Sequence, residues 1–276
     1  MKYKIEKNTV QETLIMPLYA RKVCSELYPN LYRDETAVRM IDEIDYDFSE
    51  AEKNSRGLMQ RFGSLEVAMR QNDLAFEVRD YLKSHPNAAV VNLGCGLDST
   101  GRSCDNGSCK IYNLDFPDVI AVRNELLPAG EREENIPCDL NNTEWFRKID
   151  SSNGALFFSS GVFYYFLTEQ VKALVQQMAD AFPGSVLVFD AANRTAVKMI
   201  AKTWLKSAKI KDVGAYFAVS DAPQEISAWD SRLQVTSRGY MLGYTDLKDP
   251  SVSGFFRLLA KVGDGMMKMQ IVKINF

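Results

Sequence analysis

Four short apolar runs, each bounded by turn residues, mark the middle of the chain. They are Ala88–Leu93, Lys110–Asp115, Ala155–Ser159 and Ser185–Asp190. Their apolar character is continuous rather than alternating, which is typical of strands buried on both faces of a parallel sheet. The pattern therefore predicts four neighbouring strands of an α/β protein.

A helix is predicted between the last two of these strands. Apolar residues recur there at helical spacing from Val171 to Phe182. Thr168 is the expected N-cap, and Pro183-Gly184 is expected to end the helix. Strand, helix and strand form a βαβ unit, and repetition of this unit predicts an α/β sandwich.

The two ends of the chain carry different patterns. Before the first strand, helical periodicity covers Gln11–Tyr28, Asp34–Ile44 and Ser64–Lys83, with no convincing strand between residues 9 and 83. After about Leu233 the sequence pattern again indicates strands, in QVTSRGYMLGY (234–244) and MKMQIVKINF (267–276). No repeat or linker interrupts the chain. We expect one domain over 1–276, in which a helical N-terminal lid region (1–84) packs on an α/β core (85–276).

Composition and charge narrow the possible functions. The 276 residues include 33 Lys and Arg against 36 Asp and Glu, a net charge of −3, with one histidine and five cysteines. Such a balance disfavours disorder and a nucleic-acid partner, because phosphate binding needs a concentrated basic face. No apolar run approaches the roughly 18 residues of a membrane span, and no signal peptide is recognisable. An odd cysteine count favours a reduced, cytoplasmic protein.

Metal binding is disfavoured by the same counts. One histidine cannot build a multi-histidine zinc site, and Cys104 and Cys109, which bracket a turn, lack two further ligands. His85 is expected to face solvent in a turn before Pro86. The stretch Lys198–Lys211 carries basic residues at helical intervals, which indicates a solvated helix face.

The sharpest local signal is VVNLGCGLDST, residues 90–100, where an apolar strand leads directly into Gly94-Cys95-Gly96. Glycines at this point allow a tight turn and close approach of the backbone to a ligand. Asp115 ends the next predicted strand, 21 residues after Gly94, where a carboxylate can accept both hydrogen bonds of a ribose diol. Ser99 stands where a dinucleotide fingerprint has its third glycine, which favours S-adenosylmethionine over NAD.

Several ordered blocks resemble the leucine carboxyl methyltransferase family, including its bacterial polyketide-synthesis branch. They are ETLIMPLYAR (12–21), the helix of Arg70, VVNLGCGLDST (90–100), YNLDFPDVI (112–120), CDL (138–140), SSGVFYYF (159–166) and AFPGSVLVFDA (181–191). The resemblance implies a class I, Rossmann-like methyltransferase fold with a seven-stranded, mostly parallel sheet and a reversed final hairpin. It weakens toward the C-terminus.

The resemblance also implies roles for matching positions. Arg70 would pair with the carboxylate of the cofactor, Asp115 would hold its ribose, and Asp139 would meet the adenine edge. The full set of implied cofactor-binding residues is Arg70, Gly94, Cys95, Gly96, Asp115, Phe116, Asp139, Leu140 and Ser159. Two positions depart from the family pattern, since Ser160 and Asn113 stand where relatives often carry an acid.

Acceptor-binding residues are less constrained than cofactor-binding ones. Tyr164 and Tyr165 follow the third of the four strands, at the edge where the methyl group would lie, and Tyr19 and Arg21 lie on the first helix. No catalytic residue is assigned firmly, with Tyr165 and Ser160 as candidates. A carboxylate acceptor is ionised at neutral pH and needs no base, whereas a hydroxyl needs a proton acceptor.

The sequence therefore predicts an S-adenosylmethionine-dependent O-methyltransferase, with no metal, that acts on a carboxyl or hydroxyl oxygen of a small, polyketide-like molecule. Ser160 keeps open the alternative of a cofactor-binding protein without methyltransferase activity. An NAD-dependent oxidoreductase is the third interpretation, weakened by the missing glycine. The oligomeric state is not predicted.

Overall fold

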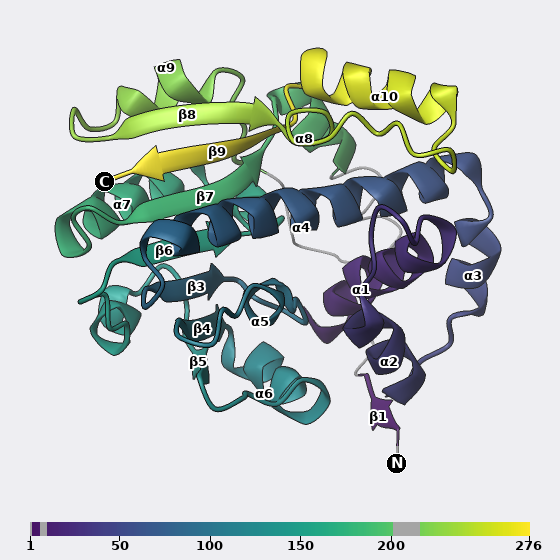
Figure 1. The fold of residues 1–276 in the computed structure, drawn as a ribbon, viewed down its shortest axis with the longest axis horizontal. Helices are drawn as coiled ribbons and strands as arrows, with labels where there is room; N and C mark the ends of the chain where they lie inside the picture. Colours follow the sequence, from purple (N-terminus) through teal and green to yellow (C-terminus); the bar gives the residue numbers. More distant parts are fainter. Residues whose placement is uncertain (1, 6–9, 201–215) are drawn as a thin grey trace.

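A seven-stranded sheet forms the centre of the protein (Figure 1). The structure is a computed structural model that describes residues 2–5, 10–200 and 216–276. Across the sheet the strands follow the order β5 (Glu133–Pro137), β4 (Lys110–Asp115), β3 (Ala89–Leu93), β6 (Ala155–Ser159), β7 (Val186–Ala191), β9 (Gln270–Asn275) and β8 (Gln234–Gly239). The strands from β5 to β7 pair in parallel, whereas β9 runs antiparallel to both β7 and β8. The predicted seven-stranded, mostly parallel sheet is confirmed.

The central strands are buried on both faces, as their continuous runs of apolar residues predict. Successive residues of β3 enter different cores: Val90 packs in one with Leu74, and Val91 packs in the other with Val175. Leu74 belongs to α4 (Leu58–Ser84) and Val175 to α7 (Thr168–Ala181), so these two helices cover opposite faces of the sheet. In Figure 1, α4 lies across the sheet on the same side as α10 (Gly254–Gly265).

The N-terminal part of the described chain is mainly helical, as expected. It contains α1 (Val10–Leu27), α2 (Glu35–Glu43), α3 (Ser49–Ser55) and α4, joined by a two-stranded pair of β1 (Tyr3–Lys4) and β2 (Ile44–Asp45). The sequence did not predict α3 or this short pair, and α4 begins six residues before the expected Ser64. Helix α1 packs against α4, α2 and α6 (Pro117–Leu126), which places it beside the carboxyl ends of β3 and β4 (Figure 1).

Helix α7 differs from its prediction by one residue. Thr168 is its first residue rather than its N-cap, which is Leu167. The backbone N–H of Leu167 donates to the Gln170 side chain at 2.8 Å, so the N-cap amide is satisfied, but no N-cap hydroxyl accepts from the first turn as a threonine cap would. The helix ends at Ala181, just before Pro183-Gly184, as predicted.

The remaining elements follow the sheet. They are α5 (Thr100–Ser103), the 3₁₀ helices η1 (Thr143–Lys148) and η2 (Phe163–Tyr165), α8 (Arg194–Ile200) and α9 (Ala222–Ser227). The final two strands are joined through α10 rather than by a tight hairpin, and β9 alone of the described sheet strands runs in reverse. The predicted basic helix face at Lys198–Lys211 lies, beyond Ile200, outside the described residues. No helix in the described ranges is long and apolar enough to cross a membrane.

Candidate functional site

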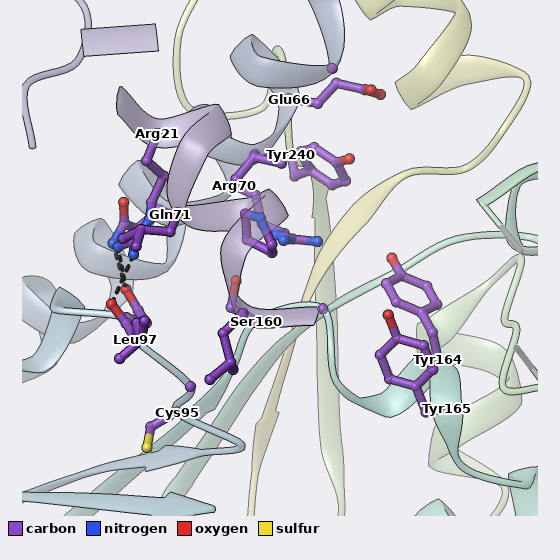
Figure 2. Close-up of a pocket in the computed structure, with 18 residues that line it drawn as sticks. Arg21, Glu66, Arg70, Gln71, Cys95, Leu97, Ser160, Tyr164, Tyr165 and Tyr240 are labelled. Atoms are coloured by element: carbon purple, nitrogen blue, oxygen red, sulfur yellow. Dashed lines mark hydrogen bonds and ion pairs between the residues drawn. The ribbon is translucent and has the colours of Figure 1, made fainter. Parts of the chain in front are cut away.

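A cavity of about 190 Å³ opens at the carboxyl ends of β3 and β6, beneath α1 and α4. In open α/β sheets ligands bind at this edge, where the strand order reverses. Here β3 is the switch point, since its neighbours β4 and β6 lie on opposite sides. Figure 2 shows the predicted residues Arg21, Arg70, Cys95, Ser160, Tyr164 and Tyr165, which line this cavity together with Gly96.

The glycine turn forms the floor of the site. Gly94 has φ of 71° and Gly96 has φ of 46°, both in the left-handed region that favours glycine. A Cβ on Gly94 would lie 2.5 Å from a methyl carbon of Val162, so the turn also needs glycine for space. The N–H groups of Gly94 and Cys95 donate to the Leu114 carbonyl at 2.8 and 2.9 Å, which ties the turn to β4.

Asp115 completes the turn from the neighbouring strand, as the sequence predicted. Its Oδ2 accepts from the Gly96 N–H at 2.7 Å and its Oδ1 from the Phe116 N–H at 2.8 Å. Burial raises the pKa of Asp115, although these two backbone donors oppose the shift. Each carboxylate oxygen keeps a second lone pair, so the carboxylate is positioned to accept hydrogen bonds from a diol.

Asp115 lies outside the lining of the cavity, and so do two further predicted residues along the same edge. Phe116 is 45% exposed beside Asp115, and Asp139 is exposed after the end of β5. The Asp139 Oδ1 accepts from the backbone and side-chain N–H groups of Asn141, both at 2.9 Å, which holds the loop. Leu140 is buried. The Phe116 ring and the Asp139 side chain are therefore exposed along the edge that also carries Asp115.

Arg70 is anchored in the cavity wall by a carboxylate that sequence reasoning left unassigned. Its Nη1 lies 3.0 Å from the Oδ2 of Asp190, which is 2% exposed at the end of β7. The other Asp190 oxygen accepts from the Gly161 N–H at 2.6 Å. Burial alone would lower the pKa of Arg70, but the adjacent Asp190 outweighs it and raises the pKa. The Arg70 Nε is buried without a hydrogen-bond partner, so the guanidinium retains donor capacity for a ligand.

The end of β6 and the segment after it supply both buried residues and residues that line the cavity. Ser159 is buried and its hydroxyl donates to the Leu93 carbonyl at 3.0 Å, which links β6 to β3. Ser160 lines the cavity. Burial raises the pKa of Tyr164 well above its ordinary value and also raises that of Tyr165. Both phenols therefore stay protonated at neutral pH, which makes them hydrogen-bonding groups rather than bases.

Arg21 and Tyr19, predicted together on the first helix, point into different places. Arg21 reaches the main cavity, where its Nη2 donates to the Leu97 carbonyl at 2.8 Å and its Nη1 pairs with Asp34 at 3.0 Å and Asp98 at 3.5 Å. Tyr19 instead lines a second cavity, of about 120 Å³, and stacks on Phe48 with ring centroids 5.4 Å apart. The structure does not bring Tyr19 to the main cavity.

Several cavity residues carried no assignment from the sequence: Glu66, Gln71, Asp98, Tyr240 and, behind Arg70, Asp190. Glu66 precedes Arg70 by four residues on α4, and this helical spacing was the signal available for it. Tyr240 follows β8, and nothing in the sequence relates it to α4.

The residues weighed for other chemistry lie elsewhere. His85 is exposed, as predicted, and stacks on Tyr81. Cys104 and Cys109 are buried free thiols. Within the described residues, no group of three or more His, Cys, Asp or Glu side chains could hold a metal ion.

Comparison with known proteins adds a family and several structural relatives. The family model described as leucine carboxyl methyltransferase matches residues 15–179. The tetracenomycin polyketide synthesis O-methyltransferase TcmP of Streptomyces glaucescens is 27% identical over 183 residues, which span 66% of each chain and so slightly less than two thirds of that relative.

The structural relatives share the fold at low identity. A candidate methyltransferase from Thermobifida fusca YX superposes with a TM-score of 0.57 at 18% identity, covering 92% of this chain and 93% of its own. The plantazolicin methyltransferase BamL superposes with a TM-score of 0.52 at 13% identity, covering 97% and 99%.

Proposed function

Because this chain belongs to the leucine carboxyl methyltransferase family, we propose that it transfers the methyl group of S-adenosylmethionine to an oxygen atom of a small-molecule acceptor. The family match and the fold support the predicted enzyme class, an S-adenosylmethionine-dependent methyltransferase. What remains to be proposed is how the described residues hold the cofactor and which acceptor they receive.

The observation that carries this proposal is the glycine turn with its carboxylate partner. Gly96 and Asp115 are joined at 2.7 Å at the switch point of the sheet, beside a cavity whose wall contains Arg70. The unpartnered Nε of Arg70 fits a carboxylate ligand, and the acid at the end of β4 fits a ribose diol. The short α5, of four residues, does not fit the long pyrophosphate-binding helix of a dinucleotide site, which counts against NAD.

The residues around the cavity would therefore bind different parts of the cofactor. Arg70 would hold the carboxylate of the cofactor, Gly94 and Gly96 would let its methionyl part pass close to the backbone, and Asp115 would bind its ribose. When bound, S-adenosylmethionine supplies an activated methyl group on a sulfonium. The protein then chiefly aligns an acceptor oxygen with that methyl carbon and excludes water.

The names of two relatives support a site that binds both a cofactor and a separate acceptor. The relative TcmP is an O-methyltransferase of polyketide synthesis, and BamL was solved with S-adenosylhomocysteine and a triazolic desmethylPZN analogue. We infer a small acceptor for this chain, with a carboxyl or hydroxyl oxygen as the methylated atom, and polyketide-like molecules as the first candidates.

Titration calorimetry with S-adenosylhomocysteine tests the proposal directly. Asp115→Ala should weaken binding by at least about tenfold, because a ribose diol loses a charged hydrogen-bond acceptor. Asp118→Ala is the matched control, since Asp118 is an exposed acid three residues away on α6 and should leave the affinity unchanged. Absence of binding by the unmodified protein at millimolar ligand contradicts the proposal, and equal affinity in both variants removes Asp115 from the site.

A second candidate function rests on Ser160. Ser160 lines the cavity at a position where the family resemblance implies an acid, so the reactive end of the cofactor would meet no charge from this position. A binding protein without transferase activity would retain affinity for S-adenosylhomocysteine and methylate no acceptor. Methyl transfer to a single carboxylate or phenol eliminates this candidate.

A further inference from the structure

Glu66 brings a carboxylate into the wall of the main cavity. It lies on α4 one helical turn before Arg70, and Tyr240, which follows β8, lines the same cavity. Figure 2 shows Glu66 and Tyr240 on one side of the space and Tyr164 and Tyr165 on the other, with their hydroxyl groups toward Tyr240. Asp98 also lines the cavity, and this part of it holds three tyrosines and the carboxylate of Glu66.

This carboxylate differs from the others near the cavity in having no hydrogen-bond partner. Asp98 accepts from Asn92 and Thr100, and Asp190 accepts from Arg70 and Gly161. The Glu66 carboxylate accepts no hydrogen bond from any residue that the structure describes. An acceptor that is bound in the cavity could therefore donate a hydrogen bond to Glu66 without first displacing a protein donor.

The charged and titratable groups that face Glu66 come from three elements. They are Arg70 on α4, Asp264 on α10, and Tyr240 after β8. Burial raises the pKa of Glu66 to about 7, with Asp264 adding to the shift and Arg70 opposing it. Burial also raises the pKa of Tyr240 well above its ordinary value, so Tyr240 stays neutral. A carboxylate poised near neutral pH suits a general base, because it can both take up and release a proton.

We propose that Glu66 is the general base of the reaction and that the acceptor is a phenolic hydroxyl. This inference rests on the proposed function and names its acceptor class. As the acceptor oxygen forms its bond to the methyl carbon, the carbon–sulfur bond breaks and its electron pair stays on sulfur. The hydroxyl proton passes to the Glu66 carboxylate, which becomes a neutral acid and later releases the proton to solvent.

A carboxylate acceptor fits the same space less well. It carries no proton to remove at neutral pH, so it has no use for a base. Its negative charge would also be repelled by ionised Glu66. Of the cations of the cavity wall, Arg21 is already paired with Asp34, and the remaining donor of Arg70 is assigned to the carboxylate of the cofactor. A neutral phenol avoids the repulsion, and its ring can pack against the tyrosines.

Three matched acceptors test the inference: 2-naphthol, a nitro-substituted naphthol that is ionised at the assay pH, and 2-naphthoic acid. Glu66→Gln should lower kcat/KM for 2-naphthol by on the order of 100-fold, since the amide cannot accept a proton. The loss should nearly vanish for the ionised nitronaphthol, which needs no base. Glu66→Asp should recover part of the rate. Asp80→Asn, an exposed acid on the same helix, is the control and should match the unmodified enzyme.

The pH profile and a binding measurement separate catalysis from structure. With 2-naphthol, kcat of the unmodified enzyme should fall as the pH drops through about 7, and Glu66→Gln should lose this acidic limb. S-adenosylhomocysteine affinity, measured on the same samples, should be equal in both proteins. Unchanged 2-naphthol turnover in Glu66→Gln, an equal loss on both naphthols, or methylation of the naphthoate alone overturns the inference. So does no turnover of 2-naphthol. In each case methylation of any of the three acceptors leaves the proposed function standing, whereas cofactor binding without turnover of any acceptor favours the cofactor-binding protein.

Discussion

The pairing of Arg70 with Asp190 shows how one buried carboxylate can organise the site. Asp190 is 2% exposed, and its two oxygens hold the Arg70 guanidinium at 3.0 Å and the Gly161 N–H at 2.6 Å. A helix and the turn after β6 are thereby fixed to the end of β7. Gly161 itself leaves room for the guanidinium, because a Cβ there would lie 3.0 Å from both terminal nitrogens of Arg70.

Asp190→Asn should destabilise the protein by about 3 kcal/mol, because it leaves a buried guanidinium without its counter-charge. S-adenosylhomocysteine affinity should fall as well, since Arg70 would lose its fixed position. Urea unfolding and calorimetry measure the two effects. Asp246→Asn removes an exposed carboxylate from its pair with Lys248 and should change stability by less than about 1 kcal/mol. A loss no larger in Asp190→Asn than in this control would mean that water compensates Arg70.

At the scale of elements, α1 is attached to the cofactor turn through one side chain. Arg21 donates from α1 to the Leu97 carbonyl of the glycine turn and pairs with Asp98 two residues after Gly96. The same guanidinium bonds Asp34, whose Oδ1 accepts from the Ala37 N–H and so caps α2. Burial would lower the pKa of Arg21, yet Asp34 and the groups around it raise it, so the residue stays charged.

Arg21→Lys should therefore weaken both the attachment of α1 and cofactor binding. An ammonium cannot reproduce the forked geometry that reaches a carbonyl and two carboxylates. We expect S-adenosylhomocysteine affinity to fall by about tenfold, with faster amide hydrogen exchange in α1. Lys22→Gln, which breaks the Lys22–Glu26 pair and the cation–π contact with Tyr19 on the same helix, should leave both measurements unchanged. Equal exchange rates in the two variants would show that packing alone holds α1.

Elements with a strong local pattern were predictable from the sequence, and those defined by distant contacts were not. The sheet was predictable from the continuous apolar sequences of β3, β6 and β7. The position of the site was predictable from the glycines after β3. Strand β5, with the sequence EENIP, was not predicted. It is an edge strand that buries little apolar surface, and its residues are mostly polar. The pairing of Arg70 with Asp190 joins residues 120 positions apart, and no local pattern encodes it.

At the scale of the whole molecule, buried acids should determine how stability depends on pH. Asp73 on α4 is 3% exposed, and its Oδ2 has no hydrogen-bond partner. Burial, together with Asp264 and Glu77, raises the pKa of Asp73 to about 9. The folded protein therefore keeps this proton between about pH 4 and pH 9, whereas the unfolded chain releases it. Because the folded state binds more protons, stability should fall as the pH rises through this window.

Asp73→Asn should remove most of this dependence, because an amide resembles the protonated acid and cannot ionise. We expect the free energy of unfolding of the variant, relative to the unmodified protein, to rise by at least about 2 kcal/mol between pH 5 and pH 8, given a limit of about 1.4 kcal/mol per pH unit for one proton. Urea denaturation at the two pH values measures it. Asp80→Asn, exposed on the same helix, should show no such change. If Asp73→Asn also shows none, the Asp73 carboxylate is ionised in the folded protein. Water must then reach it between α4 and α10, which carries Asp264.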